Sequence, residues 1–253
     1  MSNPAKIILL ADFDREYLGG RSFVLGIDEA GRGALAGPVC AGAVTVSAGL
    51  YSSVAALSSL RVLNDSKQLS RAARESVYGE LEKLKAAGLL DFEAAFAEVA
   101  EIEKLNILAA TQIAMARAAG ALNARLGLNL ARAGAAATLF GESPLDISKA
   151  QVIIDGREMK KFPYAHMPVV KGDARSLAVA AASVVAKVSR DRLMDALAPK
   201  YPRFGFEKHK GYGTAAHLQS LMLFGPTPEH RRSFLKKLRP DESSGIAEQG
   251  ILF

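Results

Sequence analysis

Two acidic residues, Asp28 and Glu29, stand side by side after the apolar run that begins at Phe23, and a Gly-x-Gly follows them at once. Two further acids also follow apolar stretches: Asp155 ends "QVIID", and Asp173 comes after "PVVKG". Side chains at strand ends in α/β proteins project into the crevice where ligands bind. Four carboxylates gathered there would carry about −4, which is strongly unfavourable without cations.

Divalent metal ions are the cations that best suit such a cluster. Carboxylate oxygens with no convergent His or Cys favour Mg²⁺ or Mn²⁺ over Zn²⁺. Two such ions about 3.5 to 4 Å apart can stabilise both the attacking and the leaving oxygen in phosphodiester cleavage. The pattern therefore predicts a metal-dependent phosphodiesterase whose acids are Asp28, Glu29, Asp155 and Asp173.

Each acid also has a simpler interpretation. Asp173 could cap the helix that begins "ARSLAVAAAS", and a lone Asp at such a position is usually a cap. Asp155 precedes a glycine, which is common in turns, and Glu29 could merely be exposed. The position of all four acids at element ends favours the metal site.

The "GRGALAG" that follows Glu29 invites comparison with a dinucleotide-binding loop. In that motif the glycines open a helix whose N-terminus holds a pyrophosphate. Here Pro38 and the strand-like "VCAGAVTV" follow instead, and the two carboxylates would repel a pyrophosphate. The context therefore disfavours a nucleotide cofactor.

The positioning elements are expected to form an α/β fold, because strand patterns alternate with helical ones. Apolar, β-branched runs predict strands at 23–28, 39–47, 90–99, 151–154 and 167–170. Helical periodicity predicts helices at 71–87, with Ser70 as the N-cap, at 102–126, and from Ala174 to about Leu197. Residues 127–150 show no clear period, and we expect no chemistry from them.

Composition places the chain among globular proteins. Its 253 residues are 49% hydrophobic and 23% charged, enough for one well-filled core. No apolar run approaches the roughly 20 residues of a membrane span, and the N-terminus lacks a signal-peptide pattern. We therefore expect a soluble, cytoplasmic monomer without membrane association. The single cysteine, Cys40, lies in an apolar stretch and is expected to be buried.

Positive charge is concentrated near the C-terminus. The whole chain carries +6, and residues 200–239 alone hold nine Lys or Arg against two acids. Such clustering suits a phosphate backbone, although a solvated helical face would account for it equally well on charge alone.

Several stretches in order along the chain resemble ribonuclease HII, the type 2 ribonuclease H family. They are "GIDEAGRG" followed by "LAGPV", "NDSKQLS", "EIEKLNIL", "IIDG", "VKGDARSLAVAAASVVAKVSRD" and "HKGYGT". Ala34 departs from the family, which usually has proline there, and removes no functional group. The resemblance implies a ribonuclease H-like mixed sheet flanked by helices, with a small helical C-terminal extension.

The resemblance also implies roles for individual residues. Asp28, Glu29, Asp155 and Asp173 would be the metal-binding catalytic acids. The turn Gly31-Arg32-Gly33 would recognise the ribose 2′-hydroxyl through its backbone, and glycine permits close approach there. Tyr212 would stack on the sugar of the adjoining deoxynucleotide, although a lone tyrosine is more often a packing residue. Phosphate contacts would come from Lys67 and Lys171, and also from Ser176 and Arg32.

The implied activity is that of an endoribonuclease acting on the RNA strand of RNA–DNA hybrids and on the 5′ side of a lone ribonucleotide in duplex DNA. Two metal ions would serve catalysis, and the products would carry 5′-phosphate and 3′-hydroxyl ends. His166, His209, His217 and His230 are scattered along the chain, and none is expected to be a general base. A type 3 ribonuclease H would have a further N-terminal domain, for which 27 residues before Asp28 are too few. A non-catalytic hybrid-binding module would not need all four acids.

The C-terminal "QGILF" resembles the bacterial motif that docks on the DNA polymerase sliding clamp, with Gln249, Leu252 and Phe253 at the constrained positions. A polar linker before it would let apolar anchors reach a pocket. The tail could instead fold back onto its own domain. We therefore expect a catalytic domain at 1–199, a basic helical extension at 200–240 and a flexible tail at 241–253.

Overall fold

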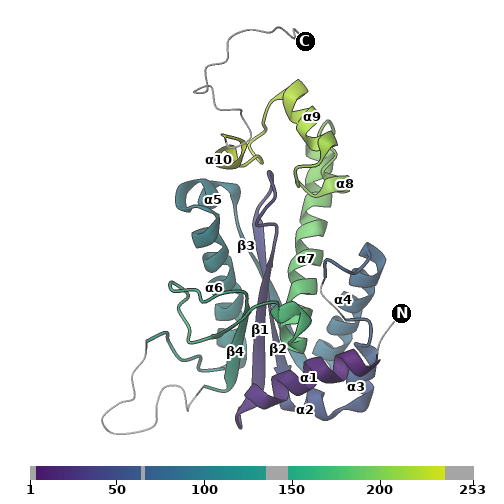
Figure 1. Ribbon diagram of the computed structural model, residues 1–253, viewed down its shortest axis with the longest axis vertical. Coiled ribbons are helices and arrows are strands. Elements are labelled where there is room, and N and C mark those ends of the chain that lie inside the picture. Colours follow the sequence, from purple (N-terminus) through teal and green to yellow (C-terminus); the bar gives the residue numbers. More distant parts are fainter. Residues whose placement is uncertain (1–3, 64–65, 135–147, 237–253) are drawn as a thin grey trace.

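The protein, described here by a computed structural model over residues 4–63, 66–134 and 148–236, is built on a five-stranded mixed sheet (Figure 1). The strand order is β3-β2-β1-β4-β5. The strands are β1 (Phe23–Ala30), β2 (Val39–Ser47), β3 (Leu90–Ala97), β4 (Ala150–Asp155) and β5 (Met167–Val169). Strand β2 is antiparallel to β1 and β3, whereas β1, β4 and β5 run parallel. The expected mixed α/β sheet is confirmed.

One face of the sheet is covered by α7 (Leu177–Leu197), which lies unusually close to β1 and β2. A Cβ added at Gly26 would lie 2.2 Å from the backbone of Ala178, and one at Gly42 would lie 2.3 Å from the Ala182 carbonyl oxygen. Only a helix with small side chains can approach a sheet this closely. The Ala-rich sequence of α7 therefore fixes the helix that follows Asp173 against the central strands.

Four further helices belong to the same layer (Figure 1). Helix α4 (Arg71–Ala86) begins as predicted, because the Ser70 hydroxyl accepts a hydrogen bond from the Ala73 N–H. Helices α1 (Pro4–Leu18), α2 (Ala48–Ser52) and α3 (Val54–Ser59) were not predicted. They close the apolar core between α7 and the end of the sheet distant from the acidic residues.

The opposite face is covered by α6 (Ile107–Leu126), which follows α5 (Val99–Leu105). The sequence predicts one helix over 102–126, and this prediction is wrong. Asn106 has φ of 75°, which no helical residue adopts, and its side-chain oxygen accepts hydrogen bonds from the N–H groups of Leu108 and Ala109. Asn106 therefore ends one helix and caps the next.

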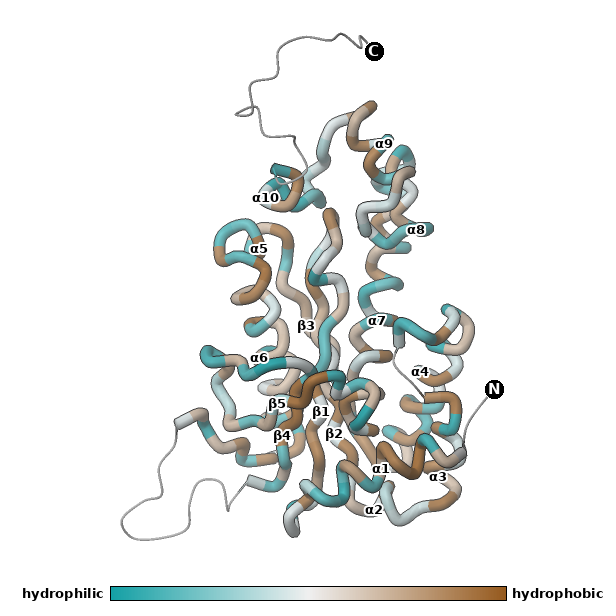
Figure 2. The backbone as a smooth tube through the Cα atoms, in the orientation of Figure 1, coloured by the Kyte–Doolittle hydropathy of each residue, from teal (hydrophilic) through white to brown (hydrophobic). Residues whose placement is uncertain are grey.

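The helical C-terminal extension consists of η2 (Ala198–Lys200), α8 (Phe206–His209), α9 (Ala215–Phe224) and α10 (Arg232–Leu235). Phe204 and Phe206 are buried against Met194 of α7 and Ala36 of the loop after β1. Apolar residues colour much of α9 in Figure 2, and its last turn exposes Met222, Leu223 and Phe224. Among the described residues, no helix combines the length and the apolar character that crossing a bilayer demands.

Candidate active site

The acidic residues meet at one end of the sheet, where β1 and β4 run side by side. Ile27 pairs with Ile154 in parallel register, so Asp28 and Asp155 occupy adjacent positions one residue further along. The Asp155 Oδ1 accepts a hydrogen bond of 2.6 Å from the N–H of Gly172, the residue before Asp173. Strand pairing and this hydrogen bond thus bring three acids from distant parts of the chain to one place.

Asp28 is the most buried of these acids, with 3% of its surface exposed. Burial raises the pKa of its carboxyl group well above the usual value, and the charges of Glu29 and Asp155 raise it further. Its Oδ1 accepts a hydrogen bond of 2.7 Å from the Glu29 N–H. A buried carboxylate beside two others is stable only when a cation compensates it.

Two basic side chains lie beside the acids. The Lys67 Nζ is 3.8 Å from Asp173 Oδ2, and the Arg32 Nη1 donates to Glu29 Oε1 at 3.0 Å. Both side chains are half exposed or more, so their pairing is weak and exchangeable. They are therefore placed to reach a substrate phosphate as well as the acids.

The donor chemistry of the cluster fits hard divalent cations, since carboxylate oxygens dominate and Asp28 is buried beside the negative charges of Glu29 and Asp155. The side chains are not yet arranged as ligands: among the described residues, no three or more Asp, Glu, His or Cys groups are arranged to hold a metal ion. Glu29 is turned towards Arg32, and Asp155 is engaged by the Gly172 N–H. Metal binding would therefore require these carboxylates to reorient.

Asp173 does not cap α7, so that simpler interpretation is wrong. It lies in the 3₁₀ turn η1 (Gly172–Ala174), and the helix begins at Leu177 instead of Ala174. The cap is Ser176, whose hydroxyl accepts from the Val179 N–H at 3.2 Å. Ser176 has no exposed surface, so in this conformation it offers nothing to a phosphate.

The turn Gly31-Arg32-Gly33 continues directly from β1, and its two glycines face different surroundings. Gly31 has φ of 90°, and a Cβ there would lie 2.0 Å from the Nε of Arg190. Gly33 is exposed, and a Cβ there would meet no atom within 4 Å. Gly31 is therefore required by the fold, whereas space beside Gly33 is open to solvent.

Tyr212 lies close to this turn, although 179 residues separate it from Gly33. The Gly211 carbonyl accepts hydrogen bonds from the N–H groups of Leu35 (2.8 Å) and Ala36 (3.2 Å), which joins the two segments. The Tyr212 ring is half buried, with the guanidinium of Arg190 5.4 Å from its centre. Lys171, the remaining predicted phosphate contact, is exposed and directly precedes η1.

Comparison with known proteins covers most of the chain. Residues 25–237 match the family model described as Ribonuclease HII. The chain is 43% identical over 219 residues to the ribonuclease HII of Magnetococcus marinus, covering 85% of this chain and 86% of that relative. It belongs to the ribonuclease HII family. Its members are metal-dependent ribonucleases H, and this chain is accordingly an enzyme of that kind.

Solved structures support the fold. The chain resembles the ribonuclease HII in a complex with PCNA from Archaeoglobus fulgidus, with a TM-score of 0.55, 19% identity and coverage of 90% of this chain and 98% of that one. It also resembles a ribonuclease HIII, termed Bst-RNase HIII, in complex with Mn²⁺, with a TM-score of 0.54, 16% identity and coverage of 82% and 71%. The ribonuclease H-like fold expected from the sequence is confirmed.

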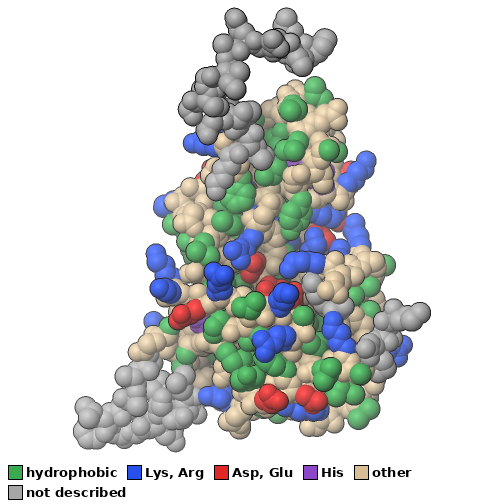
Figure 3. All heavy atoms as spheres, viewed as in Figure 1, with side chains coloured by type: hydrophobic (Ala, Val, Ile, Leu, Met, Phe, Trp, Pro, Cys, Tyr) green, Lys and Arg blue, Asp and Glu red, His purple; other side chains and the backbone are tan. Residues whose placement is uncertain are grey.

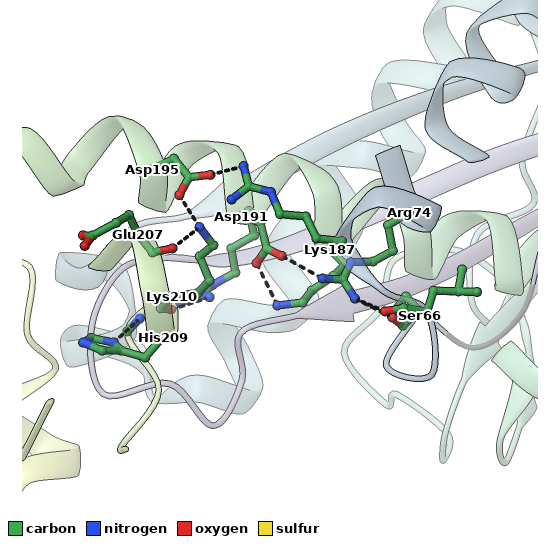
Figure 4. A network of polar contacts seen from close by, with 12 residues as sticks. Ser66, Arg74, Lys187, Asp191, Asp195, Glu207, His209 and Lys210 are labelled. Carbon is green, nitrogen blue, oxygen red and sulfur yellow. Dashed lines mark hydrogen bonds and ion pairs between the residues drawn. The ribbon is translucent and has the colours of Figure 1, made fainter. Parts of the chain in front are cut away.

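A polar network on α7 holds two of the family's predicted substrate-binding segments (Figure 4). Arg74 donates to the carbonyls of Ser66 and Leu69 on either side of Lys67, and its other nitrogen reaches Asp191. Lys210 is paired with Asp195 one turn further along α7. The network therefore fixes the loop of Lys67 and the segment before Tyr212 to one rigid helix.

Sequence reasoning missed two buried arginines beneath this ribonuclease HII site, Arg190 and Arg231, neither of which has any exposed surface. Arg190 lies among other charged residues in the second half of α7, such as Lys187 and Arg192, so no local pattern distinguished it. Arg231 was instead counted with the basic segment. Lys210 is also buried, so the surface charge there is smaller than the sequence indicates.

The remaining basic residues of that segment within the described range are exposed. They are Lys200, Arg203, Lys208, Arg232 and Lys236. Figure 3 shows that Lys and Arg side chains also surround acidic groups midway along one face of the molecule. A polyanion lying along this face would meet positive charge on both sides of an acidic centre.

Three of the four histidines, scattered in sequence, form one packed cluster. His230 Nε2 lies 3.0 Å from His217 Nε2, and the rings of His209 and His217 stack with centroids 4.3 Å apart. His230 Nδ1 accepts from the Thr227 N–H, and His217 Nδ1 lies 2.9 Å from the Tyr212 carbonyl oxygen. This cluster supports the Tyr212 segment from below.

Proposed function

We propose that this ribonuclease HII cleaves the RNA strand of RNA–DNA hybrids and cuts the 5′ side of a lone ribonucleotide in duplex DNA. The observation that carries the proposal is the continuity of β1 with the turn at Gly31–Gly33. Asp28 and Glu29 lie five and four residues before Gly33, a glycine whose surroundings are open. A reactive centre and a surface able to contact a sugar closely are thus part of one short segment.

Asp28, Glu29, Asp155 and Asp173 are the residues that would hold Mg²⁺ or Mn²⁺. The ions, when bound, would supply electrophilic stabilisation of the attacking and leaving oxygens. The protein positions the acids through strand pairing and the Asp155–Gly172 hydrogen bond. The Mn²⁺ complex of the ribonuclease HIII supports the use of such ions by this fold.

Recognition of ribose would fall to the exposed side of the turn. An N–H or carbonyl group at Gly33 can approach a 2′-hydroxyl because no side chain intervenes. Tyr212 presents part of its ring next to the turn, where it would pack on the neighbouring sugar. Lys67, Lys171 and Arg32 would contact phosphates, since all three are exposed.

The deciding experiment uses duplex DNA that contains one ribonucleotide, with all-DNA duplex of the same sequence as control. Purified protein should cut only the first duplex, only with Mg²⁺ or Mn²⁺, and on the 5′ side of the ribonucleotide, leaving a 3′-hydroxyl and a 5′-phosphate. Binding without cleavage under these conditions would instead indicate a hybrid-binding module. An RNA–DNA hybrid is tested in parallel, and cleavage of the hybrid without cleavage at the single ribonucleotide would reject incision at single ribonucleotides.

We further propose that the C-terminal tail docks on the DNA polymerase sliding clamp. The residues concerned, Gln249, Leu252 and Phe253, lie outside the described residues. Support comes from the sequence motif and from the fold's occurrence in the PCNA complex of the archaeal ribonuclease HII. The alternative, in which the tail folds back, has a candidate site: an apolar groove of about 690 Å³ between α9 and α10, lined by Leu218, Leu221 and Leu235 among others.

A further inference from the structure

The peptide group between Arg32 and Gly33 is held from inside the protein by a residue of the C-terminal extension. Arg231 Nη1 donates to the Arg32 carbonyl at 3.0 Å, and its Nε donates to the Gly37 carbonyl at 2.9 Å. Arg231 has no exposed surface. One buried guanidinium is thus hydrogen-bonded to both ends of the loop that contains Gly33, at Arg32 and at Gly37.

The orientation of that peptide follows from its planarity. In a trans peptide the carbonyl and the N–H point in opposite directions. Because the Arg32 carbonyl points inwards to Arg231, the Gly33 N–H points away from Arg231, and Gly33 itself is exposed. No backbone hydrogen bond within the described residues uses this N–H. It is a donor held ready for an external acceptor.

A second buried arginine, Arg190, is hydrogen-bonded to the same loop. Arg190 donates to the carbonyls of Ala36 and Pro38 on the loop and to that of Lys210, each at 2.9 Å. The two guanidiniums thereby satisfy five backbone carbonyls, and no carboxylate bonds to either of them among the described residues. Two buried charges without carboxylate partners are costly, which indicates that their fork geometry has a use that an apolar pair could not fulfil.

The Arg231 side chain also has an unsatisfied hydrogen-bond donor. Its Nη2 is buried and has no hydrogen-bond partner among the described residues. The Arg32 and Gly37 carbonyls are therefore the groups that the Arg231 guanidinium bonds to, and its positive charge acts mainly on them. A cation on a carbonyl polarises the whole peptide group and strengthens the N–H at its other end as a donor.

We propose that Arg231 is a positioning residue for ribose specificity: it orients and polarises the Arg32–Gly33 peptide so that the Gly33 N–H recognises the 2′-hydroxyl side of the substrate. This inference rests on the proposed function of the turn. Arg231 itself touches no substrate. It explains why a segment beyond the sheet, at the end of the described chain, is joined to a turn beside the catalytic acids.

The test measures ribose discrimination, the ratio of affinities for a duplex with one ribonucleotide and for the same duplex in all-DNA form. Binding is measured with the Asp155→Asn protein so that cleavage does not intervene. Adding Arg231→Lys should lower the ratio about fivefold to tenfold, the effect of weakening one hydrogen bond. Affinity for the all-DNA duplex should change less than twofold, because the charge is retained and buried.

The control is Arg125→Lys, which disturbs a partly exposed arginine bonded to Asp91, Glu93 and the Phe92 carbonyl on α6 and β3. It should leave the ratio unchanged. If the affinity ratio falls equally in the Arg231→Lys and Arg125→Lys proteins, the cause is a general loss of stability, and the role of Arg231 is overturned. If the Lys variant does not fold, Arg231→Gln, which keeps an amide donor, carries the same expectation.

A measurement on the unsubstituted protein keeps the inference open to refutation whatever the variants do. The Gly33 amide should exchange its hydrogen rapidly in the free protein and slowly with the ribonucleotide-containing duplex. Protection in the free protein would overturn the inference. If the unsubstituted protein binds both duplexes equally, the proposed ribose recognition itself fails; if it discriminates and Arg231→Lys discriminates equally well, only the role of Arg231 fails.

Discussion

Arg190 lies directly beneath Gly31, so closely that a Cβ on the glycine would fall 2.0 Å from Nε and 2.5 Å from Cδ of the arginine. Two glycines of one turn are thus constrained by different partners. Gly31 is confined by the protein's own interior and by its φ of 90°. The preceding carbonyl of Gly33 is held by Arg231, but the space that a side chain at Gly33 would occupy is empty, so only a bound molecule can fill it.

Alanine substitutions should separate these two constraints. Gly31→Ala should destabilise the fold by about 3 kcal/mol or more, because it combines backbone strain with a clash against a buried side chain. Gly33→Ala should leave the free energy of unfolding within about 1 kcal/mol of the unsubstituted value, yet lower cleavage about a hundredfold. Urea unfolding and steady-state cleavage measure the two effects. Normal cleavage by Gly33→Ala would remove the turn from the substrate site.

Asp28→Asn should abolish cleavage, by about three orders of magnitude or more, while hybrid binding persists through the basic surface. The same change should raise the melting temperature at neutral pH, because it removes a carboxylate whose pKa is raised by burial and by Glu29 and Asp155. Asp155→Asn should also be inactive. Glu80→Gln, on a partly exposed residue whose carboxylate pairs with Lys83 in the same helix, is the control and should keep full activity. Near-normal turnover in either Asn variant would reject the metal assignment.

Tyr212→Ala should reduce cleavage at a single embedded ribonucleotide about tenfold or more, the scale of a lost stacking contact. Its effect on overall duplex affinity should be smaller. Tyr212→Phe keeps the ring over which Lys187 and Arg190 lie at 5.4 Å and should stay close to the unsubstituted rate. Equal losses of cleavage and affinity in the Ala variant would return Tyr212 to a packing role.

The histidine cluster predicts loss of stability in mild acid. Burial, with help from the charge of His217, lowers the pKa of His230 to about 4, and burial also lowers that of His217. The unfolded chain takes up protons near pH 6.5, whereas the folded chain does not, so stability is complete above about pH 6.5 and falls towards pH 4. His230 should account for about 2 kcal/mol of this loss.

The test compares the unsubstituted protein with His230→Asn by urea unfolding from pH 7 to pH 4. The variant should be less stable at pH 7, where a hydrogen bond to His217 is lost, but its stability should decline less steeply with acid. Asp14 has the opposite effect on stability: burial raises its pKa to about 6, so its protonation in mild acid favours the folded chain. Both proteins contain Asp14, so the difference between their curves reports on His230. Parallel curves for the two proteins would show that His230 does not titrate with unfolding.

Removal of the residues after Glu248 should abolish binding to the sliding clamp while cleavage of a short substrate survives. Leu252→Ala and Phe253→Ala in the full-length chain should weaken clamp binding strongly, since buried apolar anchors carry most of such an interface. Ile251→Ala is the matched control, because the motif leaves that position unconstrained. Unchanged clamp affinity after truncation would rule out docking through the tail, and lost cleavage would indicate a tail that stabilises the enzyme.

The sequence by itself determined the class of fold, and it predicted the four acids as the metal-binding residues. Local patterns carry this information: β-branched runs predict strands, Ser70 caps α4, and acids that follow apolar runs mark strand ends whatever the chain does elsewhere. Even so, local patterns failed at Asn106, where one side chain ends a helix, and at Asp173, where Ser176 proved to be the cap.

Only the tertiary structure decided which residues serve the turn beside the acids. In the sequence, Arg231 is indistinguishable from the other basic residues near it. In the structure it is buried and donates a hydrogen bond to the carbonyl of Arg32, 199 positions away. Gly31 and Gly33 look equivalent in sequence, yet Gly31 has φ of 90° and lies against Arg190, whereas Gly33 is open to solvent. Such roles arise from contacts between distant segments. A sequence pattern shows a residue's neighbours along the chain, but burial and hydrogen bonding depend on its neighbours in space.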